Sequence, residues 1–249
     1  MYNPFSLEGK KILVTGASSG IGAETAVECS RLGANVIITG RNERRLKETF
    51  SRMEKLPSLN HKMLLADLTN ESDLEFLVDQ IDGLDGLVNN AGVNRVKPLV
   101  FIKQEDFDYI FQNNTFAGIH LIRLLSKGKK FNKNSSIVFT SSVSALFNAP
   151  GRALYASSKA ALTSLMRSVA VELADKNIRA NAVLPGMVET KLICEYLSDE
   201  DREKDMKEYP LKRYGRPEEI AWAIIYLLSD ASAWVTGASL IIDGGFMLK

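Results

Sequence analysis

The sequence is poor in the residues that support disulfide frameworks and metal centres. Its 249 residues include two cysteines, Cys29 and Cys194, which are far apart and lack metal-ligand spacing. The two histidines, His61 and His120, stand alone, with no cysteine or acidic residue at ligand spacing. We therefore expect no metal site, no disulfide framework and a reducing compartment.

The sequence also lacks a charge excess and a long apolar run. Its 31 Lys and Arg residues against 30 Asp and Glu give a net charge of +1, which argues against nucleic acid or an anionic membrane as a partner. No apolar run approaches the length of a membrane span, and residues 1–11 contain no apolar signal-peptide core. We expect a cytoplasmic protein without a nucleic-acid or membrane partner.

The first forty residues have the pattern of a strand, a glycine-rich turn, a helix and a second strand. Apolar runs at Lys11–Thr15 and Asn35–Thr39 predict the strands, and a helical pattern lies between them. The turn has the spacing Thr-Gly-x-x-x-Gly-x-Gly, with its residues Gly16, Ser18, Ser19, Gly20, Ile21 and Gly22. Such glycines let the backbone approach a pyrophosphate, which the N-terminus of the helix then binds. The alternative is an ordinary glycine-rich turn.

The end of the second strand indicates which dinucleotide the turn binds. Enzymes that use NAD(H) carry an acidic residue at this position for the ribose 2′-hydroxyl, whereas Gly40 and Arg41 stand there in this sequence. Because no carboxylate stands at this position, nothing there would repel a 2′-phosphate. The guanidinium of Arg41 is placed to bind such a phosphate. The pattern favours NADP(H) over NAD(H). Alternatively, Arg41 is a solvated residue that opens the next helix.

Two further strands end in polar residues. The strand Lys62–Ala66 leads to Asp67 and Leu68, and Asp67 is predicted either to accept a hydrogen bond from an adenine amino group or to cap the turn that follows. The strand Gly86–Asn89 leads into Asn90, Ala91 and Gly92. This second group suits another close approach of backbone to the cofactor, although alone it would pass for a turn.

The second half of the chain holds a pair of residues suited to proton transfer. Tyr155 and Lys159 are four residues apart and therefore share one face of a helix. A neighbouring ammonium favours the phenolate and lowers the pKa of a tyrosine, which makes it usable as an acid or base near neutral pH. The hydroxyl of Ser142 is a candidate to bind a substrate carbonyl oxygen. Alone, this spacing is also typical of an ordinary exposed helix.

Taken together, these motifs resemble those of the short-chain dehydrogenase/reductase family. Thr15–Gly22, Asp67, Asn89–Gly92, Ser142, Tyr155 and Lys159 have the order and spacing of that family, and the similarity extends over essentially the whole chain. The resemblance implies one Rossmann-type α/β domain over residues 1–249, with a doubly wound parallel sheet in the strand order 3-2-1-4-5-6-7. Residues 1–95 would form the cofactor half and residues 96–249 the catalytic and substrate half. A homotetramer is also implied.

The resemblance further implies roles for single residues. Asn114 would interrupt a helix from about Lys103 to Lys127 and hold a water in the proton relay. Ser142 would position the carbonyl, Tyr155 would donate the proton, and Lys159 would lower the tyrosine pKa and bind the nicotinamide ribose. The segment that contacts the nicotinamide would comprise Pro185, Gly186, Val188 and Thr190. Residues 190–212 would form a substrate lid.

The amino-acid sequence of the predicted lid is similar to that of 3-oxoacyl-[acyl-carrier-protein] reductases. This similarity implies an acyl-carrier-protein-bound keto substrate, with the carrier docked on Lys133 and Lys176 near the mouth of the active site. Relatives with similar lids reduce sugars, polyols, steroids or other small ketones, which is the alternative. A non-catalytic nucleotide-binding regulator is the remote alternative, because Asn114, Ser142, Tyr155 and Lys159 are all present.

Overall fold

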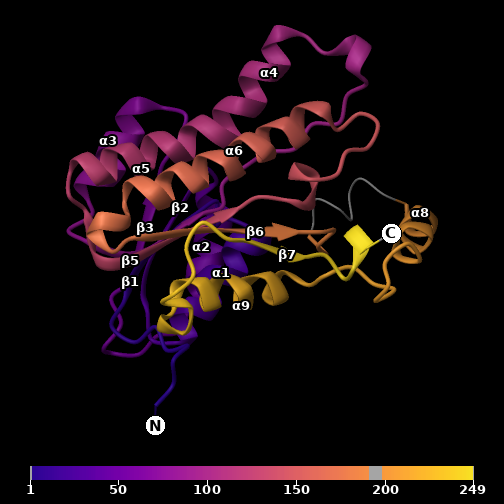
Figure 1. The fold of residues 1–249 in the computed structure, drawn as a ribbon. Coiled ribbons are helices and arrows are strands. Elements are labelled where there is room, and N and C mark those ends of the chain that lie inside the picture. Colours follow the sequence, from indigo (N-terminus) through magenta and orange to yellow (C-terminus); the bar gives the residue numbers. More distant parts are fainter. Residues whose placement is uncertain (1, 191–197, 249) are drawn as a thin grey trace.

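The computed structural model describes residues 2–190 and 198–248, which form one parallel sheet between two layers of helices (Figure 1). The strands pair in the order β3-β2-β1-β4-β5-β6-β7, and every neighbouring pair is parallel. This confirms the predicted doubly wound sheet and its strand order. The strands are β1 (Lys11–Thr15), β2 (Asn35–Gly40), β3 (Lys62–Leu65), β4 (Leu84–Asn89), β5 (Phe131–Thr140), β6 (Arg179–Pro185) and β7 (Ser239–Ile242).

Helices cover both faces of the sheet, as the upper and lower layers of Figure 1 show. One layer consists of α1 (Gly20–Arg31), α2 (Glu43–Arg52) and α9 (Pro217–Leu228). The other contains α3 (Glu71–Asp79), α5 (Ala117–Lys127) and α6 (Ala153–Glu172), with α4 (Gln104–Phe111) leading into α5 through the π-helix η2 (Gln112–Phe116). Beyond the end of the sheet lies α8 (Asp199–Met206). Short 3-10 helices are η1 (Leu99–Phe101), η3 (Val143–Ala145), η4 (Ala174–Lys176), η5 (Asp230–Ser232) and η6 (Phe246–Leu248).

Two hydrophobic cores, one on each face, hold the layers together. Successive side chains of a strand point to opposite faces, so that Leu13 of β1 packs in the core with α3, α5 and α6. Its neighbours Ile12 and Val14 pack with α1, α2 and α9. A central strand buried on both faces has to be apolar at every position, which explains why the strand signals in this sequence are continuous apolar runs.

The long helix expected over Lys103–Lys127 is interrupted where the sequence analysis predicted. The turn Gln112–Phe116 is a π-helix, which joins α4 to α5 and contains the buried residue Asn114. A π-helical turn holds one residue more than an α-helical turn, and such turns are frequent at functional sites. The interruption falls at the residue whose amide bonds to Val93, in the loop after β4, and to Ser158 of α6.

All the strands end at the same edge of the sheet, because all of them are parallel. At this edge the chain leaves β1 at Gly16, β4 at Asn90, β5 at Ser141 and β6 at Gly186. Ligands of doubly wound sheets bind at the carboxyl ends of the strands. In Figure 1 this edge faces α8 and the C-terminus. None of the helices described in residues 2–190 and 198–248 is long and apolar enough to cross a membrane.

Candidate active site

The turn after β1 requires glycine for steric reasons. Gly16 and Gly20 have φ angles of +63° and +56°, a region that favours glycine. A Cβ on Gly22 would collide with the side-chain amide of Asn90 and with the carbonyl oxygen of Gly16. The turn is therefore a cradle of bare backbone at the start of α1, open to a phosphate group.

Thr15 ties this turn to the loop after β4. Its Oγ1 accepts hydrogen bonds from the backbone amides of Asn90 and Ala91, both at 3.0 Å, and donates to the carbonyl oxygen of Val88 at 3.2 Å. The Asn90 side chain returns a bond of 3.1 Å from Nδ2 to the Thr15 carbonyl oxygen. The two loops therefore form one surface, and the residues present fit a dinucleotide.

The residues after β2 and β3 form an ion pair beside this surface. Arg41 Nη1 lies 3.5 Å from Asp67 Oδ2, and both side chains are partly exposed. Asp67 also accepts bonds from the backbone amide of Thr69 at 2.9 Å and from its hydroxyl at 2.7 Å. Although burial opposes it, the Thr69 bonds and the Arg41 charge lower the pKa of Asp67. Asp67 thus caps its turn, one of the two predicted roles, and Leu68 beside it is buried.

The position that would carry the NAD-specific acid is a glycine in close surroundings. A Cβ on Gly40 would lie 3.2 Å from Ser18 Oγ and 3.6 Å from a Leu46 methyl carbon. The guanidinium of Arg41 and the hydroxyl of Ser18 therefore border this part of the surface without a carboxylate from β2.

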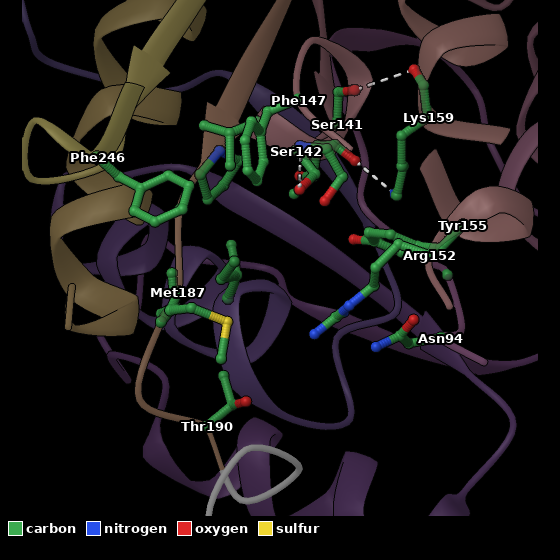
Figure 2. A pocket seen from close by; sticks show the side chains of 18 of the residues that line it. Asn94, Ser141, Ser142, Phe147, Arg152, Tyr155, Lys159, Met187, Thr190 and Phe246 are labelled. Carbon is green, nitrogen blue, oxygen red and sulfur yellow. Dashed lines mark hydrogen bonds between the residues drawn. The ribbon is translucent and has the colours of Figure 1, made fainter. Parts of the chain in front are cut away.

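A cavity of about 680 Å³ opens at the same edge of the sheet (Figure 2). It collects side chains that the sequence places up to 225 positions apart, from Ile21 to Phe246. The predicted site residues that line it are Ile21, Asn90, Gly92, Ser142, Tyr155, Lys159, Pro185, Gly186, Val188 and Thr190. The remaining predicted residues surround the cavity or lie along the ends of β1, β2 and β3: Gly16, Ser18, Ser19, Gly20, Gly22, Arg41, Asp67, Leu68, Ala91 and Asn114.

Lys159 is buried at the base of the cavity. Its side chain is held by a hydrogen bond of 2.8 Å from Nζ to the backbone carbonyl oxygen of Thr140, the last residue of β5. Burial lowers the pKa of Lys159 to about 8. The Nζ atom lies 5.7 Å from the centroid of the Tyr155 ring. A cation is therefore fixed below the phenol ring.

The phenol of Tyr155 differs from the sequence-based expectation. Burial raises the pKa of Tyr155, while a hydrogen bond with Ser142 and the charge of Arg152 lower it, and the net direction is upward. The expected lowering by Lys159 is not found, because the Lys159 ammonium lies over the ring and is bonded to Thr140 rather than to the hydroxyl. Ser142 itself is fixed by a bond of 3.1 Å that its Oγ accepts from the Ser144 amide.

Asn114 lies behind Lys159 rather than on the cavity surface. Its Oδ1 accepts a bond of 2.7 Å from the Val93 amide, and its Nδ2 donates to the Val93 carbonyl oxygen at 2.9 Å and to Ser158 Oγ at 3.0 Å. A Cβ on Gly92 would lie 3.1 Å from Asn114 Oδ1 and 3.5 Å from Lys159 Nζ. The missing side chain of Gly92 is what lets these two polar groups approach the loop after β4.

The segment after β6 is fixed at both of its ends. The amide of Glu189 donates to the Gly215 carbonyl oxygen at 2.8 Å, and the Gly215 amide donates to the Met187 carbonyl oxygen at 3.0 Å. Among the residues that the structure describes, the N–H and C=O of Val188 have no hydrogen-bond partner, and Val188 lines the cavity. The methyl group of Thr190 lies 3.2 Å from where a Cβ of Gly20 would stand, so the segment reaches the glycine turn.

Several cavity residues carried no signal that the sequence analysis used. Phe246 stacks on Tyr209 with ring centroids 5.0 Å apart, and Phe147 meets Phe246 edge-on at 5.4 Å. Arg152 enters the cavity beside Tyr155, opposite Phe246 and Met187 (Figure 2). Only Arg152 had a usable signal, its spacing of three residues from Tyr155 at the start of α6. The aromatic wall depends on tertiary contacts of the C-terminal residues.

The predicted lid is described only in part. Residues 191–197 lie outside the described residues, whereas α8 follows them and contributes Asp201 and Asp205 to the cavity lining. Asp205 accepts a bond of 2.7 Å from the Tyr214 hydroxyl, and Asp201 accepts one of 2.6 Å from Ser198. The described part of the lid therefore borders the cavity. Among the residues searched, 2–190 and 198–248, no cluster could hold a metal ion.

The two lysines expected at the mouth of the site lie elsewhere. Lys133 is in the first part of β5, and Lys176 is in η4, just before β6. The cavity lies at the carboxyl ends of these strands, whereas both lysines lie at the other end. The seven steps from Lys133 to Thr140 span about 23 Å of extended chain. The expectation that the two lysines flank the mouth is therefore wrong within a single chain. Sequence similarity gave their positions in the chain but not the end of the sheet at which they lie.

Comparisons with known proteins agree with this geometry. Residues 16–247 match the model of a family described as enoyl-(acyl carrier protein) reductase. The 3-oxoacyl-[acyl-carrier-protein] reductase FabG of Thermotoga maritima is 37% identical over 246 residues, which cover 97% of this chain and 99% of the relative. The glucose 1-dehydrogenase of Gluconobacter oxydans is 36% identical, with coverages of 96% and 92%.

A solved structure of 7α-hydroxysteroid dehydrogenase, complexed with NADH and 7-oxoglycochenodeoxycholic acid, has a TM-score of 0.91 at 33% identity. The match covers 98% of both chains. The relatives are thus similar over their full length but differ in the substrates that their names give.

Proposed function

Because the chain belongs to the short-chain dehydrogenase/reductase family, we propose that it reduces a ketone to a secondary alcohol with NADP(H), or catalyses the reverse reaction. The observation that carries this proposal is the convergence of Ser142, Tyr155 and Lys159 on one cavity. That cavity opens at the same edge of the sheet as the glycine cradle, so a dinucleotide bound there would reach the three side chains. A regulator without activity would have no need for this convergence.

The dinucleotide supplies hydride when bound, and the chain supplies its position. We propose that the cradle Gly16, Ser18, Ser19, Gly20, Ile21 and Gly22 holds the pyrophosphate, while Asp67 and Leu68 border the adenine. Asn90, Ala91, Gly92 and Lys159 would hold the nicotinamide ribose, and Pro185, Gly186, Val188 and Thr190 the nicotinamide. The absence of a carboxylate at Gly40 and the guanidinium of Arg41 support NADP(H) over NAD(H).

We propose that the hydroxyls of Ser142 and Tyr155 bind the carbonyl oxygen of the substrate. Both side chains line the cavity, and the Ser142 hydroxyl is near enough to lower the pKa of Tyr155, so one substrate oxygen could accept a bond from both. We propose that Tyr155 gives its proton to that oxygen. The cation of Lys159 beneath the ring would stabilise the negative charge that then develops on the phenol. Asn114, bonded to Val93 and Ser158, would shape the polar region behind Lys159 through which the proton is replaced.

We propose a 3-oxoacyl thioester, as carried by acyl carrier protein, as the substrate. Support comes from the full-length similarity to a reductase of that name and from the apolar wall of Phe147, Tyr209 and Phe246, which suits an acyl chain. The position of Lys133 and Lys176 gives no support to docking of the carrier at the cavity of the same chain. The alternative substrate class comprises sugars, polyols, steroids and other small ketones, in line with the names of the other relatives.

The test measures NADPH oxidation with acetoacetyl-coenzyme A. The same assay is run with a panel of sugars, cyclic ketones and an oxosteroid. Turnover of the thioester at least tenfold above the panel in kcat/KM would support the acyl substrate. Turnover confined to the panel would assign the chain to the alternative class. Absence of turnover with every ketone, in the presence of measured NADPH binding, would contradict the enzymatic proposal.

We also propose that the protein forms a homotetramer and is located in the cytoplasm. Support for assembly comes from large apolar side chains exposed on and before α4, on η2 and on α6, among them Val100, Phe101, Phe107, Phe116 and Val171. Light scattering after size exclusion measures the mass directly, and a mass of about one chain would contradict the tetramer.

A further inference from the structure

Arg152 is a cation in the cavity that has no partner in the described structure. It stands at the N-cap of α6, three residues before Tyr155, and its side chain is partly buried. Among the described residues its guanidinium makes no hydrogen bond and no ion pair. Figure 2 shows the group directed into the middle of the cavity. An arginine held in a cavity without an ion-pair partner is placed to bind a carboxylate of a ligand.

The charge of Arg152 acts on two phenols that line the same cavity. The charge of Arg152 lowers the pKa of Tyr155, and it acts in the same direction on Tyr209 across the cavity. Arg152 therefore stands within electrostatic reach of the hydroxyl that meets the substrate carbonyl. A group bound by Arg152 would lie on the substrate, close to the reacting carbon.

The other charged groups that line the cavity already have partners. Lys159 is bonded to Thr140, Asp201 to Ser198 and Asp205 to Tyr214. Neither aspartate lies within ion-pair distance of Arg152, and both belong to α8 beyond the end of the sheet. Of the described lining residues, Arg152 is thus the charged group left to the ligand.

Asn94 adds an unused acceptor to the same wall. Its Oδ1 atom is buried and has no hydrogen-bond partner among the described residues. Its side chain lines the cavity together with Arg152. A buried acceptor without a donor costs free energy until a ligand hydroxyl or a moved arginine donates to it. The wall beside Tyr155 therefore has both a donor fork and an acceptor available.

We propose that Arg152 binds a carboxylate of the substrate, and that the chain accepts short oxo acids whose carboxylate lies one or two bonds from the ketone. This inference rests on the proposed ketone reduction at the same site. In a 3-oxo acid the carboxylate takes the place of the thioester carbonyl of a 3-oxoacyl substrate, so one position of Arg152 serves both. A carboxylate offers the guanidinium two charged oxygens, whereas a thioester offers one neutral oxygen.

The reaction with an oxo acid needs only NADPH and one proton, which solvent returns to Tyr155 after the transfer. A hydride from NADPH adds to the ketone carbon, and the Tyr155 proton adds to its oxygen. The products are a hydroxy acid and NADP⁺, and the carboxylate stays unchanged on Arg152.

The test compares acetoacetate with ethyl acetoacetate, two 3-oxo compounds that differ in whether the acid carries its charge. For the natural chain we expect kcat/KM with NADPH to favour acetoacetate at least tenfold, the scale of one charged hydrogen-bonded pair. Arg152→Gln should abolish this preference, and Arg152→Lys should keep part of it. Arg167→Gln, on the exposed side of the same helix, is the matched control and should keep the full ratio.

A preference of the natural chain for the ester, or a ratio that Arg152→Gln leaves unchanged, would overturn the proposal. A second readout separates it from the proposed catalysis. Calorimetric titration of 3-hydroxybutyrate in the presence of NADPH, a pair that cannot react because both partners are reduced, measures the carboxylate site without turnover. Binding weakened at least tenfold by Arg152→Gln, with no such loss for Arg167→Gln, supports the anion site even if no ketone is reduced. Equal affinity in both variants, or no binding to the natural chain, overturns it.

Discussion

The ammonium of Lys159 donates a hydrogen bond of 2.8 Å to the carbonyl oxygen of Thr140, across the contact between α6 and the end of β5. This bond fixes a side chain that is 4% exposed, and it offsets part of the loss of hydration. The position of the cation is therefore set by the sheet and not by Tyr155. Stability and catalysis place opposite demands on this residue.

Replacing Lys159 by Met should stabilise the protein at neutral pH while abolishing most activity. Burial lowers the pKa of Lys159 from 10.5 to about 8, so the folded state binds this proton less tightly than the unfolded state does. The charge thus destabilises the fold fully below pH 8, by about 3 kcal/mol at most, and the effect fades as the pH rises toward 10.5. Thermal unfolding at pH 6 to 10 measures the gain of Lys159→Met.

The control for this prediction is Lys127→Met, at an exposed position at the end of α5. It should change the melting temperature little, and equally at each pH. A gain for Lys159→Met that does not shrink with rising pH, or a loss throughout the range, would contradict the account of the buried charge.

Tyr155→Phe should remove the proton donor and leave the cofactor surface intact. We expect kcat to fall at least a hundredfold, in the range of general acid catalysis, because the hydroxyl bonded to Ser142 is lost. NADPH affinity, followed by fluorescence titration, should change less than about threefold, since the glycine cradle lies outside this contact. Unchanged turnover would refute the role of Tyr155.

Arg41→Ala should distinguish the two cofactors. Loss of the guanidinium removes the proposed 2′-phosphate contact, so the Kd for NADPH should rise at least tenfold while that for NADH changes little. Stability should hardly move, because the pair with Asp67 is partly exposed and 3.5 Å long. Arg44→Ala, whose partner Glu48 lies on the same exposed helix, is the control. An equal loss for both cofactors would remove the phosphate assignment.

Gly22→Ala should distort the dinucleotide cradle. Its Cβ would collide with the Asn90 amide and the Gly16 carbonyl oxygen, and backbone groups cannot move aside cheaply. We expect weaker binding of both NADPH and NADH, by at least tenfold, and a lower melting temperature. Gly215→Ala is the matched control, because its nearest neighbour would lie 3.7 Å away. Equal cofactor affinity for Gly22→Ala and the natural chain would show that the turn is not the binding surface.

The sequence predicted best what depends on local pattern. The continuous apolar runs of the central strands and the glycine spacing of Gly16 to Gly22 arise from constraints within a few residues, and the sheet order follows from the family. The interruption at Asn114 was also predicted, although its form, a π-helix, was not. The predicted range of β1 is confirmed, and the ends of β2, β3 and β4 differ from their predicted ranges by one or two residues.

What the sequence could not give depends on distances across the fold. The pKa of Tyr155 is raised because burial outweighs the charges near it, and burial is a property of the packed molecule. Lys133 and Lys176 lie at the other end of the sheet from the cavity, which an alignment does not reveal. Arg152 could have been predicted, because it stands three positions before Tyr155, but its lack of a partner among the described residues is visible only in the structure.

The stacking of Phe246 on Tyr209 has a practical consequence for handling the protein. Two glycines with positive φ, Gly244 and Gly245, bring Phe246 back over the cavity, and Asp243 fixes this turn through the amides of Gly245 and Met247. The last described residues, Phe246–Leu248, form η6 beside the substrate wall, whereas the first described residues lie far from it (Figure 1). An affinity tag at the carboxyl end would therefore follow directly on this wall. A purification tag at the amino end leaves the catalytic cavity undisturbed, and kinetic constants measured with a tag at the carboxyl end would describe an altered pocket.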